Sequence, residues 1–176
     1  TFTHEFGHVL GLADMYATNG ATHYTLGDWS IMDGGVYLNS GRTPPAYSAF
    51  ERFQLGFLTP KILSNPATIE LSPLVTGNEA YIIAQNDTHN LNPDSPAPSE
   101  FFILENRQKI GWDSYLPGNG MLVYRINYNK SNFYNNSVNN NINDMGVDIM
   151  EADGIGSEST MYGDPFPGFY NKTEYT

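Results

Sequence analysis

The stretch HEFGHVLGLAD, residues 4–14, determines where a metal ion could bind and how the start of the chain must fold. In a helix, His4 and His8 lie four residues apart on one face and can point two imidazoles at one ion. Two such nitrogens suit zinc, and Glu5 need not be a ligand and can take the proton of a metal-bound water. Gly11 tolerates the positive φ that ends a helix, so the chain can turn and return Asp14 as a third ligand. Three protein ligands leave the fourth position of zinc open, which is typical of catalytic sites.

Two other residues compete for a place at the metal. Glu51 falls in the next expected helix, and in another class of zinc peptidases a Glu on a later helix is the third ligand. The offsets within residues 4–14 favour Asp14. His23 lies in a polar loop, where a lone histidine is more often exposed to solvent. The His-Glu-x-x-His spacing also arises by chance on amphipathic helices, and its two histidines would then bind no metal.

Composition excludes several classes of function. The 176 residues carry a formal net charge of −11, so the chain lacks the excess of Lys and Arg that neutralises nucleic-acid phosphates. Without cysteine it can form neither disulfides nor Cys-based metal sites. No apolar run approaches the roughly 20 residues of a membrane span. A hydrophobic fraction of 40% suffices for a core, and 14% aromatic residues favour a β-rich surface.

A Gly- and Asp-rich turn and a second helix follow the first motif. In GDWSIMDGG, residues 27–35, the Trp, Ile and Met side chains predict a tight turn anchored in the core. Met32 would form a hydrophobic base beneath the histidines, because its flexible thioether fills irregular space. The prolines in residues 43–47 suit the first turn of a helix, which we expect to end before residue 60.

Beyond residue 60 the sequence is typical of β structure. Runs of β-branched and aromatic residues predict strands at 67–71, 80–84, 100–106, 121–128 and 146–152. Polar loops separate them, among them residues 86–99 and an Asn-rich stretch, 132–143, that we expect to be mobile. The predicted fold class is α+β. Residues 1–60 would contain the metal-site helix, the Met-containing turn and the second helix, and residues 61–176 would form a mainly antiparallel β-rich region packed on them.

These motifs together resemble a known family of peptidases. The pattern H-E-x-x-H-x-x-G-x-x-D over residues 4–14, followed by WSIM at 29–32, resembles the metzincin zinc signature and its Met-turn, with Asp in place of the usual third His. The Asp variant is similar to the snapalysins and to the immune inhibitor A-like metallopeptidases. The rest of the chain resembles the second group, notably in FILENRQ at 102–108, EADG at 151–154 and GDPFPG at 163–168.

The resemblance implies a metzincin-like fold, with residues 1–60 as a partial metallopeptidase catalytic domain, and a zinc-dependent endopeptidase that acts on protein or peptide substrates. It implies zinc on His4, His8 and Asp14, with Glu5 as the general base and Met32 in the Met-turn. It also implies a bacterial enzyme, secreted or at the cell surface, that is made as part of a longer multidomain precursor. Neither nucleic acid nor a membrane span would be involved.

Two further groups of residues are candidates for a role. Tyr37 is the candidate for the tyrosine that assists the transition state in some metzincins. Near the end of the chain an acidic group could hold calcium, which prefers several oxygen ligands in flexible geometry: Asp148, Glu151, Asp153 and Asp164. The competing interpretation of this group is a solvated acidic loop.

The family's catalytic domain has a substantial part before the zinc helix, and we expect this chain to lack it and to be a weak or inactive peptidase alone. The apolar side of the first helix would then miss structure that it normally packs against: Phe2, Phe6, Val9 and Leu10. The alternative to an enzyme is a non-catalytic β-rich binding module with a structural or vestigial metal site. Glu5 favours the enzyme, because a structural site has no use for a base.

Overall fold

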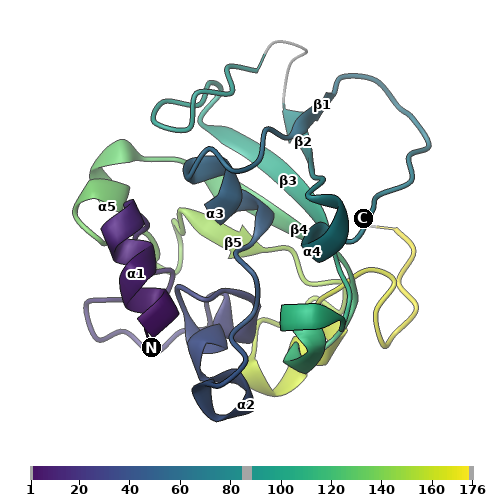
Figure 1. Cartoon of the computed structure of the whole chain (residues 1–176). Helices are drawn as coiled ribbons and strands as arrows, with labels where there is room; N and C mark the ends of the chain where they lie inside the picture. Colours follow the sequence, from purple (N-terminus) through teal and green to yellow (C-terminus); the bar gives the residue numbers. More distant parts are fainter. Residues whose placement is uncertain (1, 85–88, 175–176) are drawn as a thin grey trace.

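A five-stranded sheet forms the centre of the computed structural model, which describes residues 2–84 and 89–174 (Figure 1). Its strands follow the order of the sequence: β1 (Lys61–Leu63), β2 (Tyr81–Ala84), β3 (Glu100–Arg107), β4 (Gly120–Asn127) and β5 (Val147–Ile149). β1 runs parallel to β2, and every other neighbouring pair is antiparallel. The α+β class and the mainly antiparallel β region are confirmed.

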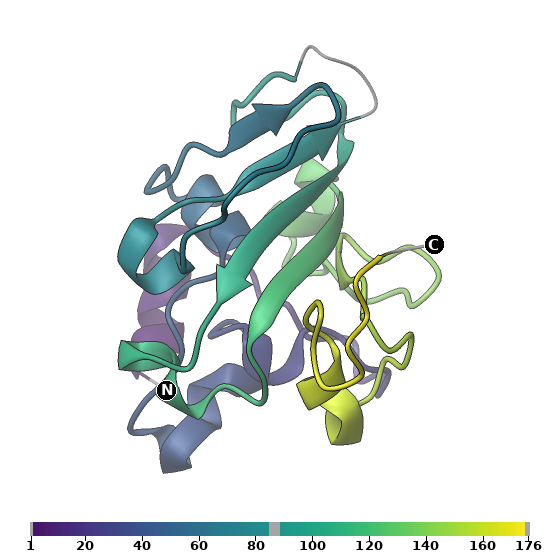
Figure 2. The ribbon, with the colours of Figure 1, turned by 90° about the vertical axis from the view of Figure 1, so that its right-hand side faces the viewer.

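Short helices surround the sheet. The α-helices are α1 (Phe2–Leu10), α2 (Leu38–Gly41), α3 (Ala49–Gln54), α4 (Leu74–Gly77) and α5 (Lys130–Tyr134), and the 3₁₀ turns are η1 (Gly27–Trp29), η2 (Gly34–Tyr37), η3 (Gly111–Tyr115) and η4 (Glu158–Gly163). Figures 1 and 2 show α1 and α3 on one side of the sheet and the last segment of the chain on the other. None of the helices in the described ranges is long and apolar enough to cross a bilayer.

The expected strands are present with one exception. Residues 67–71 form no strand and lie in a largely exposed loop, while the short parallel edge strand β1 occupies residues 61–63 instead. The β-branched residues of 67–71 have no buried face to line, and β propensity depends on such packing more than on the backbone itself. Part of the expected loop 86–99, residues 86–88, lies outside the described residues.

The second helix begins later than the prolines suggested. α3 starts after Ser48, whose hydroxyl accepts a hydrogen bond from the Glu51 N–H, while the Glu51 carboxylate accepts one from the Ser48 N–H. This reciprocal capping box satisfies two N–H groups that a helix start would otherwise leave unpaired. Phe53 of this helix meets Phe101 of β3 edge to face, with ring centroids 6.4 Å apart.

One continuous core joins the two parts of the chain. β4 alternates strictly between buried and partly buried residues, as a strand with one covered face should. Its buried Tyr124 and Ile126 belong to the same apolar cluster as Trp29 and Phe50 from the first 60 residues. The division into residues 1–60 and 61–176 therefore does not separate two cores.

The apolar side of α1 is outside this core. Phe2 is 79% exposed and Val9 77%, and Phe6 and Leu10 are also exposed. The side of α1 that packs on the chain carries His4 and Gly7, its two buried residues. The helix is thus held to the fold by its metal-site face and by its C-terminal turn.

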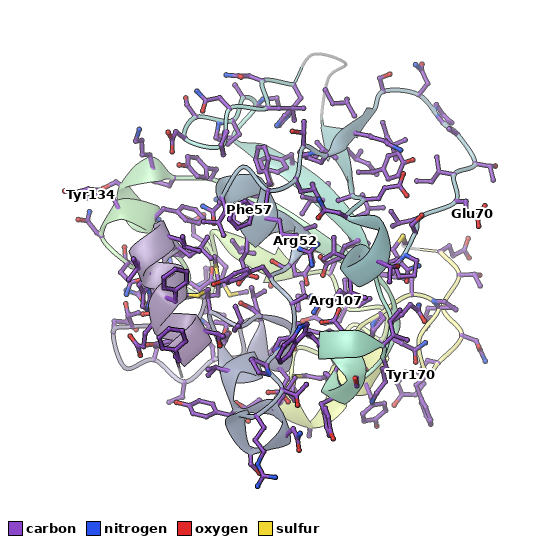
Figure 3. The ribbon with its side chains drawn as sticks, in the orientation of Figure 1. Arg52, Phe57, Glu70, Arg107, Tyr134 and Tyr170 are labelled. Atoms are coloured by element: carbon purple, nitrogen blue, oxygen red, sulfur yellow. The ribbon has the colours of Figure 1, made fainter. Side chains whose placement is uncertain are left out.

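A buried guanidinium connects the sheet to the segments in front of it. Arg107, near the middle of the molecule in Figure 3, is fully buried. Its Nε and Nη2 donate to the two oxygens of Asp113 at 3.0 and 2.9 Å, and its Nη1 donates to Glu105 at 3.1 Å. The remaining N–H groups reach the backbone carbonyls of Trp29 and Ala46 at 3.4 and 3.3 Å. All five donors of the side chain are used, as a charge taken out of water requires.

The two carboxylates extend the same network to the start of α3. Glu105 accepts hydrogen bonds from the Ala49 N–H at 2.5 Å and from the Tyr124 hydroxyl at 2.8 Å. Asp113 accepts one from the Ala46 N–H at 2.9 Å. β3, β4, η3 and the segment that leads into α3 are therefore fixed relative to one another by polar groups that water does not reach.

Replacing Arg107 by methionine should lower the free energy of unfolding by about 3–5 kcal/mol, because two buried carboxylates would lose their counter-charge. Urea unfolding followed by circular dichroism measures this loss. Arg125→Met is the matched control: Arg125 pairs with Glu100 at 2.7 Å across a partly exposed surface, where an ion pair contributes about 0.2–1 kcal/mol. Equal losses in the two variants would contradict a central role for Arg107.

Candidate metal centre

The helix that carries the two histidines ends as the sequence predicted. Gly11 adopts a φ of +107°, which favours glycine. The Leu12 N–H bonds to the Gly7 carbonyl and the Gly11 N–H to the His8 carbonyl, both at 3.0 Å, which is the pattern of a Schellman cap. The cap reverses the chain direction directly after the helix, so Asp14 returns toward the histidines.

Both imidazoles are oriented by backbone carbonyls. Nδ1 of His4 lies 2.9 Å from the Ile31 carbonyl, and Nδ1 of His8 lies 2.9 Å from the Leu12 carbonyl. A carbonyl only accepts, so in each neutral ring Nδ1 carries the proton and Nε2 keeps its lone pair. Such a partner on the far nitrogen is the usual arrangement for a histidine that binds a metal.

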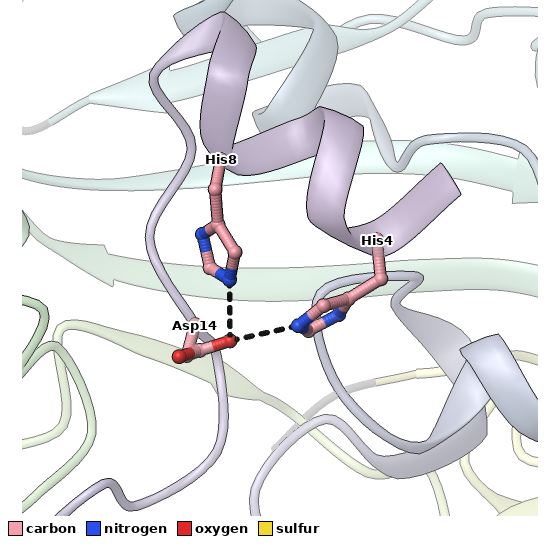
Figure 4. A group of neighbouring side chains, drawn as sticks. All are labelled: His4, His8 and Asp14. Atoms are coloured by element: carbon pink, nitrogen blue, oxygen red, sulfur yellow. Dashed lines mark ion pairs between the residues drawn. The ribbon is translucent and has the colours of Figure 1, made fainter. Parts of the chain in front are cut away.

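The three expected ligand atoms converge on one point (Figure 4). Oδ1 of Asp14 lies 3.1 Å from Nε2 of His4 and 3.2 Å from Nε2 of His8. Two ligands on a tetrahedral zinc, each about 2.0–2.1 Å from the ion, are about 3.3 Å apart. Within the described part of the chain, no other group of three or more His, Cys, Asp or Glu side chains converges in this way.

The chemistry of the group fits a cation. Asp14 is buried, and its Oδ1 has no hydrogen-bond donor among the described residues. With Nε2 unprotonated in both histidines, three electron-rich atoms face one another. A buried acceptor without a partner costs about 1–3 kcal/mol, whereas an ion between the three atoms satisfies all of them. Two nitrogens and one carboxylate oxygen form a set that suits zinc.

The Met-containing turn lies beneath the helix. Met32 is fully buried, and its thioether rests against Gly7, so closely that a side chain at Gly7 would overlap with the sulfur. Since Gly7 lies between the two histidines, this is the place expected for a hydrophobic base under them. The turn is also bonded to the returning chain, from the Met15 N–H to the Met32 carbonyl at 2.9 Å.

A pocket opens beside the histidines. Its volume is about 370 Å³, and its lining residues are His4, Glu5, Tyr16, Asp33, Gly34, Val36 and Tyr37. The Glu5 side chain is exposed, so it can meet water or a ligand there. Tyr37, the expected tyrosine, is 69% exposed at the rim. Tyr16 was not anticipated; burial and the Asp14 carboxylate raise the pKa of its phenol, which keeps it a proton donor.

The two rivals for the metal have other partners. Glu51 is fully buried and accepts hydrogen bonds from the Ser30 hydroxyl at 2.5 Å and from the Ser48 N–H at 2.6 Å. Burial raises the pKa of this carboxyl above its ordinary value. Nε2 of His23 lies 2.8 Å from the Asn139 carbonyl, and the residue is half-buried rather than exposed. Neither belongs to the group of converging ligand atoms.

The acidic residues proposed for calcium do not gather into one ligand set within the described ranges. Burial raises the pKa of Asp148 above its ordinary value, and the charge of Arg125, its partner across the strands, offsets part of this effect. Asp164 accepts hydrogen bonds through Oδ2 from Trp29 Nε1 at 2.8 Å and from the Tyr24 hydroxyl at 2.9 Å. Glu151 and Asp153 lie near enough to raise the pKa of Asp164. A calcium site at these residues stays a prediction.

Part of the Asn-rich stretch is packed and bonded, although we expected the whole of residues 132–143 to be a mobile insert. Asn139 is fully buried, donates to the carbonyls of Met15 and Val147 at 2.8 and 2.9 Å and accepts from the Val147 N–H at 3.1 Å. Asn140 accepts from the Thr18 N–H at 2.7 Å. The side-chain amides of this Asn-rich stretch hold the loop that follows the metal-site helix. No local pattern in the sequence reveals this role.

The first part of the chain matches a known family model. Residues 1–59 match the model of a family described as immune inhibitor A peptidase M6, catalytic domain. The match spans α1, the Met-containing turn and α3, and it supports a metallopeptidase-family domain there. Comparisons with curated proteins and with solved structures gave no significant match.

Asp14→Ala should weaken zinc binding by more than the roughly 10- to 100-fold that changes around a ligand typically cost, because it removes a ligand itself. Glu51→Gln should leave zinc affinity close to that of the unaltered chain. Competition with a chromophoric chelator measures both. If Glu51→Gln lost the metal and Asp14→Ala kept it, the third ligand would be Glu51.

The Asp164 carboxyl should make stability depend on pH. Burial, with smaller effects of Glu151 and Asp153, raises its pKa to about 7 from the model-compound value of 3.8. The folded chain therefore keeps a proton that the unfolded chain releases, so this contribution to stability is present below about pH 4 and is lost as the pH rises to about 7. Urea midpoints at pH 5 and pH 8 should differ less in Asp164→Asn than in the unaltered chain.

Added calcium tests, in the same assay, whether the acidic group at Asp148, Glu151, Asp153 and Asp164 binds this ion. An ion at Asp164 would compensate the buried charge at pH 8 and raise the urea midpoint there. A midpoint that calcium leaves unchanged would identify the acidic group as a solvated loop with one buried carboxyl.

Proposed function

We propose that this chain carries the metal centre of a zinc-dependent endopeptidase. The observation that supports this most directly is the convergence of His4, His8 and Asp14 around a buried carboxylate oxygen that has no hydrogen-bond donor among the described residues. Three protein ligands leave a fourth position for water, the pattern of a catalytic rather than a structural zinc. The family match over residues 1–59 supports the same class of enzyme.

Zinc bound at this centre would supply a Lewis acid that lowers the pKa of a coordinated water toward about 7 and polarises the substrate carbonyl. The residues of the chain do the rest. Glu5 lines the pocket next to His4 and takes the proton of the attacking water, then delivers it to the amine that leaves. The carbonyls of Ile31 and Leu12 hold the imidazoles in the tautomer that keeps both Nε2 atoms free.

The pocket beside Glu5 would receive part of a protein or peptide substrate. Tyr16 and Tyr37 both line it and can donate hydrogen bonds to a substrate carbonyl as charge develops on its oxygen. Secretion and a longer precursor stay predictions from the resemblance.

The alternative is a binding module with a structural or vestigial metal site. A structural zinc is normally enclosed by four protein ligands. Among the residues that the structure describes the ligand set numbers three, and the carboxylate of Glu5, which is not part of it, borders the adjoining pocket. These features favour catalysis.

Glu5→Gln should keep zinc and lose activity, because it removes the proton acceptor without touching a ligand. General acid–base groups contribute about 10²- to 10⁴-fold, and a loss in that range is expected when the variant is made in the full-length enzyme and assayed on an unstructured protein substrate such as casein. Zinc content is measured in parallel: a variant that loses activity but keeps zinc has lost a base, whereas loss of zinc would indicate that Glu5 is a ligand. Glu70→Gln, at an exposed residue far from α1 in Figure 3, is the control and should change neither quantity. Activity of Glu5→Gln within about threefold of the unaltered enzyme would rule out the assigned role.

A further inference from the structure

Asp14 is held by an amide from a distant part of the chain. Nδ2 of Asn136 donates to Oδ2 of Asp14 at 2.7 Å, and Oδ1 of Asn136 accepts the Asp14 backbone N–H at 2.6 Å. The Asn136 side chain thus forms hydrogen bonds with both the backbone and the carboxylate of Asp14. The two residues are 122 positions apart.

These hydrogen bonds give the two carboxylate oxygens of Asp14 different partners. Oδ2 is engaged by the amide, whereas Oδ1 faces Nε2 of His4 and Nε2 of His8. A carboxylate without such a partner can rotate about its last torsion, which is broad and roughly two-fold, or can offer both oxygens to a cation. With Oδ2 engaged, rotation would break a hydrogen bond and leave a buried oxygen unpaired.

The amide is itself fixed before any ion binds. Asn136 follows the C-cap residue of α5, Asn135, and has a φ of +54°, in the left-handed region that Asn tolerates better than most residues. The next residue is anchored by a bond from the Ser137 N–H to the Asn132 carbonyl at 2.8 Å. The Asn136 carbonyl also accepts from the Thr18 hydroxyl at 2.6 Å. The side chain therefore points at Asp14 from a rigid turn.

We propose that Asn136 is a positioning residue of the metal centre, which orients Asp14 so that it binds the ion through Oδ1 alone. The proposal rests on the proposed function, because it assumes that the three ligands hold a metal. Partners of this kind orient ligands in many metal sites, and their loss typically weakens metal binding by 10- to 100-fold. The family match ends at residue 59, so this residue lies outside the stretch that carries the ligands.

A purely structural role is the rival explanation, since other amides of the same stretch also hold the loop after α1. Asn140 provides the matched control. It accepts hydrogen bonds from the Thr18 N–H at 2.7 Å and from the Thr18 hydroxyl at 3.2 Å, so it anchors the same loop without touching Asp14. A general loosening of the loop would follow from either substitution, whereas misorientation of the ligand would follow only from a change at Asn136.

The experiment compares Asn136→Gly and Asn140→Ala in the whole chain. Glycine removes the amide and suits the left-handed backbone, so the turn is not strained. Zinc affinity is measured by competition with a chelator, and the visible absorption of bound cobalt(II) reports the coordination geometry. We expect Asn136→Gly to bind zinc about 10- to 100-fold more weakly and to show an altered cobalt spectrum. Asn140→Ala should match the unaltered chain within about twofold and keep its spectrum.

Other outcomes have definite meanings. Equal losses of affinity in the two variants, or an unchanged affinity and spectrum in Asn136→Gly, would overturn the proposal. An unaltered chain that binds no zinc would refute the proposed function instead. Asn136→Asp serves if the glycine variant does not fold: it preserves size and backbone preference but turns the donor to Oδ2 into an acceptor. An unaltered cobalt spectrum in that variant would also refute a positioning role.

Discussion

The guanidinium of Arg107 imposes the strictest constraint on this structure. A planar cation removed from water tolerates little change in its five donors, so the groups it binds must keep fixed relative positions. Those groups are Asp113, Glu105 and two carbonyls, one of which belongs to Trp29 in the turn beneath the metal centre. Two residues further along, the Ile31 carbonyl orients His4. The position of one imidazole is thus linked to the sheet through a chain of satisfied polar contacts.

The metal centre is supported from three directions. The helix cap supplies the return of the chain and, through Leu12, the carbonyl for His8. The turn supplies the carbonyl for His4 and the sulfur that packs against Gly7. The Asn-rich stretch supplies the partner of Asp14. Each support comes from a different segment, so the ligand atoms are held in place by the fold rather than by the helix alone, as precise sites require.

The local features were predictable from the sequence and the distant ones were not. The end of α1 at Gly11, the convergence of three ligands and the burial of Met32 depend on spacings within a few residues. Local propensity was misleading at two places. Residues 67–71 form an exposed loop because none of the described strands pairs with them, and α3 starts late because the Ser48 side chain caps it. Asn136 gave no signal, since its partner Asp14 lies 122 positions away. The burial of Arg107 gave none either, because the carbonyls that complete its contacts belong to Trp29 and Ala46, 78 and 61 positions away.

The link between Asp14 and Asn136 also makes the metal centre depend on the whole fold. During synthesis the ligand helix emerges more than 100 residues before the amide that completes its surroundings, and closing so long a loop costs entropy that the contacts of the folded chain must offset. An ion that arrives early therefore meets two histidines on a short, loose helix. The complete centre is a product of folding, and by linkage any ion that prefers it stabilises the closed chain as a whole. Metal capture would in this way help to hold together two segments that lie 122 positions apart.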